Sequence, residues 1–143
     1  MIDNIFPWLI LGLVTLTGCG QHVPAVTGGT QGILECEGQK IGDVQLTLYP
    51  GEGTATAPVG FAVTQLDGTF ELYKMGATGP LWLPAGQYRC TLESVGAPVQ
   101  IPSRYMKPET TPLTVDWTEG MDHLHIRGPD LTHHQKKLHQ KKR

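Results

Sequence analysis

The sequence predicts an all-β fold, an antiparallel β-sandwich of about seven strands. Glycine (18 residues) and proline (11 residues) are abundant in this chain of 143 residues, as expected where turns are frequent. β-Branched and aromatic residues come in short runs, and no long stretch repeats its apolar residues with helical spacing. The runs recur at intervals of ~8–12 residues, which is typical of two packed antiparallel sheets.

The N-terminus resembles the signal peptide of a bacterial lipoprotein. Residues 5–17 form an apolar run that is shorter than the ~20 residues of a transmembrane helix. This run leads to Leu16-Thr17-Gly18-Cys19, which resembles the lipobox, where the cysteine receives a diacylglyceryl group and the bond before it is cut. We therefore expect residues 1–18 to be removed and Cys19 to carry lipid. Cleavage beyond Gly20 and a retained membrane anchor are the alternatives, because the first four residues lack the usual Lys or Arg.

The resemblance also implies a place in the cell envelope. Lipoproteins held at the inner membrane typically carry Asp after the lipidated cysteine, whereas this chain has Gly20. We therefore expect an outer-membrane protein that faces the periplasm. Residues 19–30 are small and polar and include Pro24 and the pair Gly28-Gly29, a composition that predicts a flexible tether.

Seven strands are expected after the tether, at residues 33–36, 44–49, 61–66, 69–73, 87–93, 113–117 and 123–127. Their alternation places a set of side chains in the core: Val44, Leu46, Leu48, Phe70, Leu72, Tyr88, Cys90 and Leu92. Asp67-Gly68 predicts a two-residue hairpin between the third and fourth strands, because this pair accepts positive φ angles. Residues 37–43 and the pair Glu119-Gly120 are expected to form turns.

The four blocks at residues 32–50, 64–70, 83–88 and 101–115 resemble carboxypeptidase regulatory-like domains, which have the transthyretin-like (prealbumin-like) sandwich. Residues 32–50 are similar to the opening strand pair of that family, residues 64–70 to its T-x-x-D-G-x-F hairpin, and residues 83–88 to its P-x-G-x-Y strand entry. Residues 101–115 resemble the I-P-x-K-Y-x-x-P-x-T-S-P-L-T-V signature of small bacterial lipoproteins with this domain. The resemblance covers nearly all of residues 31–127 and implies a non-catalytic accessory or binding module.

Proline recurs in residues 101–113, at positions 102, 108 and 112. Because proline lacks a backbone donor and fixes φ, we expect this segment to run extended along the domain edge without joining a central strand. Tyr105 has two interpretations here. It either docks the segment by burying its ring, or it forms part of a ligand surface together with Arg104.

Cys36 and Cys90 lie in predicted strands and are both expected to face the core. An oxidising envelope compartment allows them to pair. We predict a disulfide, which would close a loop of ~55 residues and add on the order of 4 kcal/mol by the loop-entropy estimate. The alternative is two buried thiols that do not meet.

His123 and His125 have the spacing of a metal-binding pair, since residues two apart on a strand lie on one face. The alternative is two solvent-exposed histidines. Intradiol dioxygenases share a related sandwich core and an H-x-H pair, with Tyr88 and Tyr105 as the plausible partners here, but Tyr88 is expected to point into the core. No catalytic triad spacing, phosphate-binding loop or paired-carboxylate motif is evident in the sequence. We therefore expect no enzyme and no cofactor.

Charge divides the chain into an acidic body and a basic tail. Residues 19–132 hold six basic and twelve acidic side chains, whereas residues 133–143 hold five basic and none acidic. Residues 128–143 follow the last strand and have too few apolar side chains to pack, so a disordered His- and Lys-rich tail is expected. This tail either serves solubility or contacts an anionic envelope polymer or lipid. An envelope location excludes nucleic acid as a partner.

Together these features predict a lipid-anchored β-sandwich of the bacterial cell envelope. We expect it to act as a non-catalytic structural or binding module, with a protein or carbohydrate ligand and with the membrane contacted through the N-terminal lipid. The alternative is a metal-binding or metal-dependent envelope protein that uses His123 and His125.

Overall fold

The computed structural model describes residues 28–53 and 57–131, in which the regular elements are eight strands and two short 3-10 helices. The strands are β1 (Gln31–Cys36), β2 (Gln39–Lys40), β3 (Val44–Pro50), β4 (Gly60–Val63), β5 (Thr69–Glu71), β6 (Gly86–Ser94), β7 (Thr114–Trp117) and β8 (Leu124–Arg127). The 3-10 helices are η1 (Met75–Ala77) and η2 (Ser103–Tyr105). The predicted leader, the predicted lipidation residue Cys19 and the basic residues 133–143 lie outside the described residues. Within the described ranges, no helix is long and apolar enough to cross a membrane.

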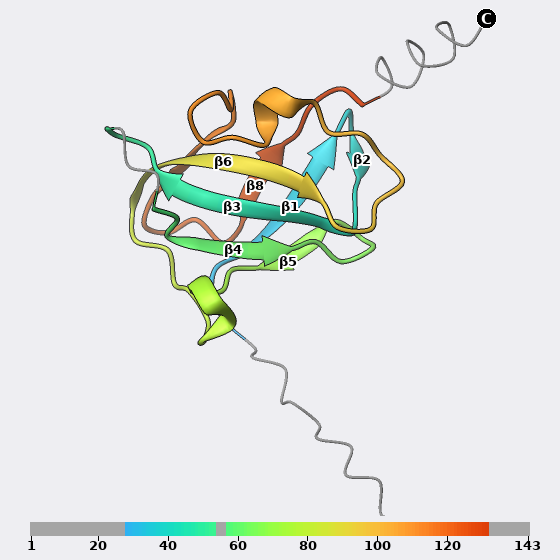
Figure 1. Ribbon diagram of the computed structural model, residues 1–143. Coiled ribbons are helices and arrows are strands. Elements are labelled where there is room, and N and C mark those ends of the chain that lie inside the picture. Colours follow the sequence, from blue (N-terminus) through green and yellow to red (C-terminus); the bar gives the residue numbers. More distant parts are fainter. Residues whose placement is uncertain (1–27, 54–56, 132–143) are drawn as a thin grey trace, which may run out of the picture.

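The strands form two sheets that pack face to face, which confirms the predicted all-β sandwich (Figure 1). In the first sheet, β1 pairs with β2, β5 and β8. The second sheet has the strand order β4-β3-β6-β7. All pairs are antiparallel except β1 with β8, which is parallel because the chain changes sheets between β7 and β8.

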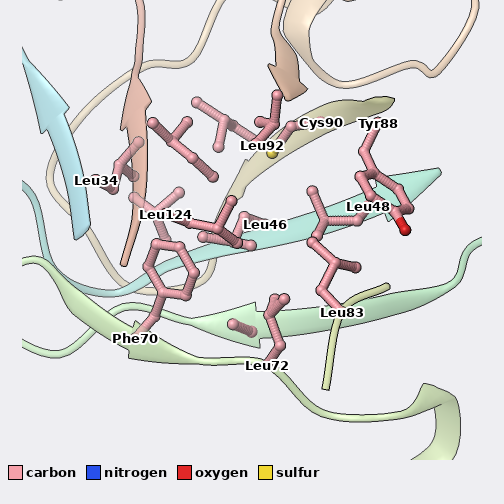
Figure 2. Packing of buried hydrophobic residues seen from close by; sticks show 14 residues of the cluster. Leu34, Leu46, Leu48, Phe70, Leu72, Leu83, Tyr88, Cys90, Leu92 and Leu124 are labelled. Atoms are coloured by element: carbon pink, nitrogen blue, oxygen red, sulfur yellow. The ribbon is translucent and has the colours of Figure 1, made fainter. Parts of the chain in front are cut away.

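The inner faces of the two sheets enclose one hydrophobic core, seen from close by in Figure 2. The largest of the fully buried side chains are Leu34, Val44, Leu46, Leu48, Phe70, Leu72, Cys90, Leu92 and Leu124. Burying each large aliphatic or aromatic side chain contributes ~1.5–3 kcal/mol. The predicted inward positions are confirmed, including Tyr88, whose hydroxyl donates a hydrogen bond of 2.7 Å to the carbonyl of Pro84.

The turn at Asp67-Gly68 forms, but it differs from the predicted two-residue hairpin. The backbone N–H of Gln65 donates to the carbonyl of Thr69 at 2.8 Å, so three residues lie in the loop, and of these only Gly68 has a positive φ, 78°. This is the pattern of a type I turn followed by a left-handed glycine. The two arms then join different sheets, since β4 pairs with β3 in the second and β5 pairs with β1 in the first, and they meet again at a bridge between Phe61 and Tyr73.

Residues 101–113 lie along β6 and contain no named strand, as predicted. The hydroxyl of Thr111 donates to the carbonyl of Cys90 at 2.6 Å, and the N–H of Cys90 donates to the carbonyl of Leu113 at 2.9 Å. The segment is not extended throughout, because η2 and a turn that begins at Lys107 shorten it. Proline therefore keeps it out of the sheet without keeping it straight.

The packed part of the chain extends beyond the predicted limits of residues 31–127. Thr30, expected in the tether, is 5 % exposed, and its N–H and carbonyl bond to Leu81 and Leu72 at 2.8 and 2.9 Å. Leu131, expected in the tail, is 9 % exposed. The local composition did not indicate that Thr30 belongs to the packed domain, because its hydrogen-bond partners are distant in the sequence.

Candidate binding site

Three polar side chains form a row across the outer face of the first sheet. Gln31 on β1 pairs with Glu71 on β5, and the pairing of Gly32 with Leu124 places His123 beside Gln31. The side-chain amide of Gln31 donates a hydrogen bond of 3.2 Å to Glu71 Oε1. We call Glu71, Gln31 and His123 the polar row.

The polar row lines a hollow of about 200 Å³, together with Gln65 and Thr69. These side chains present carboxylate, amide, imidazole and hydroxyl groups. The hollow therefore offers both donors and acceptors of hydrogen bonds. We call it the polar hollow.

A second hollow, of about 250 Å³, has aromatic walls and shares Gln31 with the first. Trp82, Trp117, Met121 and Asp122 line it, with the chain at residues 28–30. Trp82 is 70 % exposed, so its indole presents most of its area to solvent. We call this the aromatic hollow.

The backbone on both sides of Trp82 is fixed by hydrogen bonds. The N–H of Leu81 donates to the carbonyl of Leu72 at 2.8 Å, and the N–H of Leu83 donates to the hydroxyl of Thr30 at 2.8 Å. Leu83 is also 6 % exposed and belongs to the core. The indole of Trp82 is thus presented to solvent from an immobilised segment.

The other walls of the aromatic hollow come from β7 and the turn that follows it. Trp117 is the last residue of β7, pairs with the start of β6 and is partly buried against the core. The N–H of Thr118 donates to Met121 Sδ at 3.4 Å, which closes the turn and holds Met121 in the wall. Gly28 lies close to the indole of Trp82, since a Cβ added there would lie 3.6 Å from Trp82 Cζ2.

Neither Trp82 nor Trp117 was predicted from the sequence as part of a site. Trp82 stands between Leu81 and Leu83, and inward-facing leucines at both positions would have placed it outward by strand alternation. That signal was present in the sequence. No local pattern, however, brings Trp117 to Trp82, because they are distant in the chain and on different elements.

No protein-family model matches this chain, and comparison with curated proteins and with solved structures finds no similar protein. The resemblance to carboxypeptidase regulatory-like domains therefore stays a prediction based on the four sequence blocks. The site is assigned from its geometry alone.

His123 and His125 are both exposed on the outer face of the first sheet, as strand alternation predicted. They line different hollows, His123 the polar hollow and His125 a hollow of about 460 Å³ beside Pro112 and Arg127. In residues 28–53 and 57–131, no group of three or more His, Cys, Asp or Glu side chains is arranged to hold a metal ion. His123 therefore shares its hollow with the other members of the polar row and not with His125.

Cys36 and Cys90 are free thiols in this structure, so the predicted disulfide is not present. Both side chains are buried and face inward, as expected, Cys36 from β1 and Cys90 from β6. Cys36 Sγ and Leu92 Cδ1 both lie against Gly128. This places Cys36 near Leu92, which is two residues from Cys90 on β6, a displacement of ~7 Å along a strand.

Burial raises the pKa of Cys36 to about 11 and the pKa of Cys90 to about 12. For Cys36 the carboxylate of Glu37 raises the pKa further, and a hydrogen bond to the backbone of Gly128 opposes the shift. For Cys90 a hydrogen bond to the backbone of Thr47 opposes it. Both thiols are therefore protonated at neutral pH and lack the thiolate that nucleophilic chemistry requires.

Tyr105 docks its own segment, the first of the two interpretations above. It is 7 % exposed, and its hydroxyl accepts a hydrogen bond of 3.2 Å from Arg104 Nη2. The guanidinium carbon of Arg104 lies 4.9 Å from the centre of the Tyr105 ring, within the range of a cation–π contact. Of the predicted ligand surface, Arg104 is exposed and Tyr105 is buried.

Proposed function

We propose that this chain is a lipid-anchored protein of the cell envelope whose β-sandwich is a non-catalytic binding module, with the aromatic hollow as its binding site. Trp82 is the observation on which the proposal depends, because its indole is 70 % exposed on a hydrogen-bonded backbone. A tryptophan buries ~150–250 Å², so a ligand that covers the exposed part gains roughly 3–4 kcal/mol at ~25 cal/mol per Å². Open hollows with large apolar walls and a few polar groups are typical of binding sites.

The anchor and the location are supported by the sequence. Leu16-Thr17-Gly18-Cys19 supports lipidation at Cys19, and Gly20 supports the outer membrane, facing the periplasm. The resemblance to carboxypeptidase regulatory-like domains, with the transthyretin-like topology that it implies, supports an accessory module. The five basic residues after Thr132 support a second contact, with an anionic envelope polymer or lipid.

A non-catalytic role is supported by the chemistry of the nucleophile candidates. Cys36 and Cys90 are buried, and burial keeps them protonated. His123 lies in the polar hollow beside Gln31 and Glu71, so we assign it to the binding face and not to a metal centre with His125.

The proposal is tested by asking whether an envelope component stabilises the protein through Trp82. Full-length protein and its Trp82→Ala variant are mixed with separated glycan, lipid and protein fractions of the envelope, and the midpoint of thermal unfolding is measured. Val95→Ala is the matched control, because Val95 is 53 % exposed and lies just beyond β6, away from the aromatic hollow. We expect one fraction to raise the midpoint of the wild type and of Val95→Ala but not of Trp82→Ala. If no fraction raises the midpoint of the wild type, the binding function is wrong.

A further inference from the structure

We propose that the site binds a neutral sugar chain, with one pyranose ring in the aromatic hollow and the next ring in the polar hollow. This inference rests on the proposed binding function and names the class of its ligand. The two hollows adjoin, because Gln31 lines both, and the consecutive residues Asp122 and His123 line one hollow each. A ligand of two linked rings is therefore able to contact both hollows at once.

The aromatic hollow has the two kinds of surface that a pyranose needs. A pyranose ring has apolar C–H faces and carries hydroxyl groups around its edge. Trp82 provides a flat apolar surface open to solvent, and Trp117 provides a second indole. Asp122 and Gln31 stand in the same hollow, where a carboxylate accepts hydrogen bonds from hydroxyls and an amide both donates and accepts. The volume of about 250 Å³ is below the ~300–1,000 Å³ of pockets for drug-sized ligands and suits a single ring.

The polar hollow has the groups to bind the hydroxyls of a second ring. The hydrogen bond from Gln31 Nε2 to Glu71 Oε1 holds both side chains in place. The amide oxygen of Gln31 and the second carboxylate oxygen of Glu71 can accept hydrogen bonds from sugar hydroxyls. His123 adds an imidazole next to Gln31, so the row presents three polar groups at strand spacing.

The charges of the two hollows favour a neutral ligand. Glu71 and Asp122 are carboxylates, and none of the described residues that line the hollows is Lys or Arg. An acidic sugar or a phosphate would be repelled and would find no cationic partner there. A quaternary ammonium group would be attracted by the indoles and by Asp122, but such cations are bound within enclosing aromatic cages. Because Trp82 is an open platform, the geometry favours the flat face of a sugar.

The experiment is calorimetric titration of the full-length protein with defined neutral sugars. The detergent is a polyoxyethylene ether, because glycoside and phosphocholine detergents would themselves compete for the site. The probes are maltose, cellobiose, lactose and N,N′-diacetylchitobiose, each beside its monosaccharide, with glucuronic acid and choline as charged comparisons. We expect saturable binding of at least one disaccharide, weaker binding of its monosaccharide, and no binding of glucuronic acid.

Three variants locate the sugar within the site. Trp82→Ala should weaken binding of the disaccharide at least tenfold, and Trp82→Tyr should restore part of it, because tyrosine keeps an aromatic platform. Glu71→Gln should weaken the disaccharide severalfold and leave the monosaccharide unchanged, since only the second ring reaches the polar hollow. Val95→Ala should bind like the wild type, and circular dichroism checks that each variant is folded.

Different results would overturn the proposed ligand class and the proposed binding function. If no neutral sugar binds but an envelope fraction still stabilises the wild type and not Trp82→Ala, the sugar proposal is wrong and the binding function stands. Saturable binding of choline without binding of any neutral sugar likewise overturns the sugar proposal alone. If neither a sugar nor an envelope fraction binds, both proposals are wrong.

Discussion

Gly128 packs so closely against the sulfur atom of Cys36 that no side chain fits between them: a Cβ there would lie well inside the 3.0 Å that real Cβ contacts respect. The N–H of Gly128 also donates to the carbonyl of Glu35 at 2.8 Å, which continues the pairing of β8 with β1. This contact closes the core at the carboxyl end of β1.

Gly128→Ala should lower the free energy of unfolding by about 1–3 kcal/mol, because an extra methyl group forces the packed neighbours apart. Cys36→Ala removes the sulfur atom and makes room for that methyl group. In denaturant titrations, the double variant is therefore expected to lose less stability than the sum of the two single variants. Strictly additive losses would contradict the contact.

The two core thiols should be unpaired and protected in the folded protein. Alkylation of the native protein without reductant is expected to leave Cys36 and Cys90 unmodified, since both are buried. Alkylation after denaturation, again without reductant, should modify both. Mass spectrometry of the peptides checks this prediction, and a cross-linked Cys36–Cys90 peptide would show that the disulfide forms after all.

Stability should fall in alkaline solution because of the same thiols. Their folded pKa values, about 11 and about 12, lie above the ~8.5 of an unfolded cysteine, so the folded state holds its thiol protons more tightly. Their contribution to stability is present below pH ~8.5 and is lost as pH rises toward the folded pKa values, by at most about 1.4 kcal/mol per pH unit for each thiol. Denaturant titrations between pH 7 and pH 10 measure this slope. The stability of Cys90→Ala should fall less steeply with pH than that of the wild type. An unchanged slope would show that the Cys90 thiol does not cause the loss of stability.

Trp82 and Trp117 should differ in their effect on folding although both line the aromatic hollow. Trp82→Ala is expected to change the free energy of unfolding by less than ~0.5 kcal/mol, because most of the indole is already in water. Trp117→Ala removes a ring that packs against the core and should cost about 2–3 kcal/mol. Urea titrations of both variants test this difference. A large loss for Trp82→Ala would mean that its ring serves the fold and not a ligand.

Lipidation of Cys19 is expected in cells that make the full-length chain. Radioactive palmitate should label the wild type, and Cys19→Ala should take no label and should leave the membrane fraction. Cys36→Ala is the control, since a buried core thiol is not a lipidation site. Label that persists in Cys19→Ala would show that the lipobox interpretation is wrong.

The strands were predictable because their signal is local. In β6, alternation alone placed Tyr88, Cys90 and Leu92 inward, and all three are buried. The sheet to which a strand belongs is not a local property. The arms around Asp67-Gly68 look like one hairpin in sequence, but β4 and β5 find their main partners in different sheets.

The same limit explains why the predicted disulfide is not present and why the binding site was not predicted. Alternation showed that Cys36 and Cys90 face inward, but not which residues of the other sheet each one meets, because this depends on how the two sheets are displaced against each other. The aromatic hollow joins Trp82, Trp117 and Gln31 from three parts of the chain. His123 was singled out for its spacing from His125, whereas strand pairing places it next to Gln31, with which it lines the polar hollow.

Gly28, which lies close to the ring of Trp82, follows Cys19 by nine residues. A chain advances at most ~3.3–3.6 Å per residue, so nine residues reach no farther than about 32 Å. A lipid on Cys19 would thus keep the aromatic hollow within that distance of the bilayer surface, whatever path the intervening residues take. Since β1 and β8 run in parallel, the described chain leaves at the opposite end of the first sheet. The protein would therefore sample only a thin layer next to its own membrane, and its ligand must either belong to that layer or extend into it.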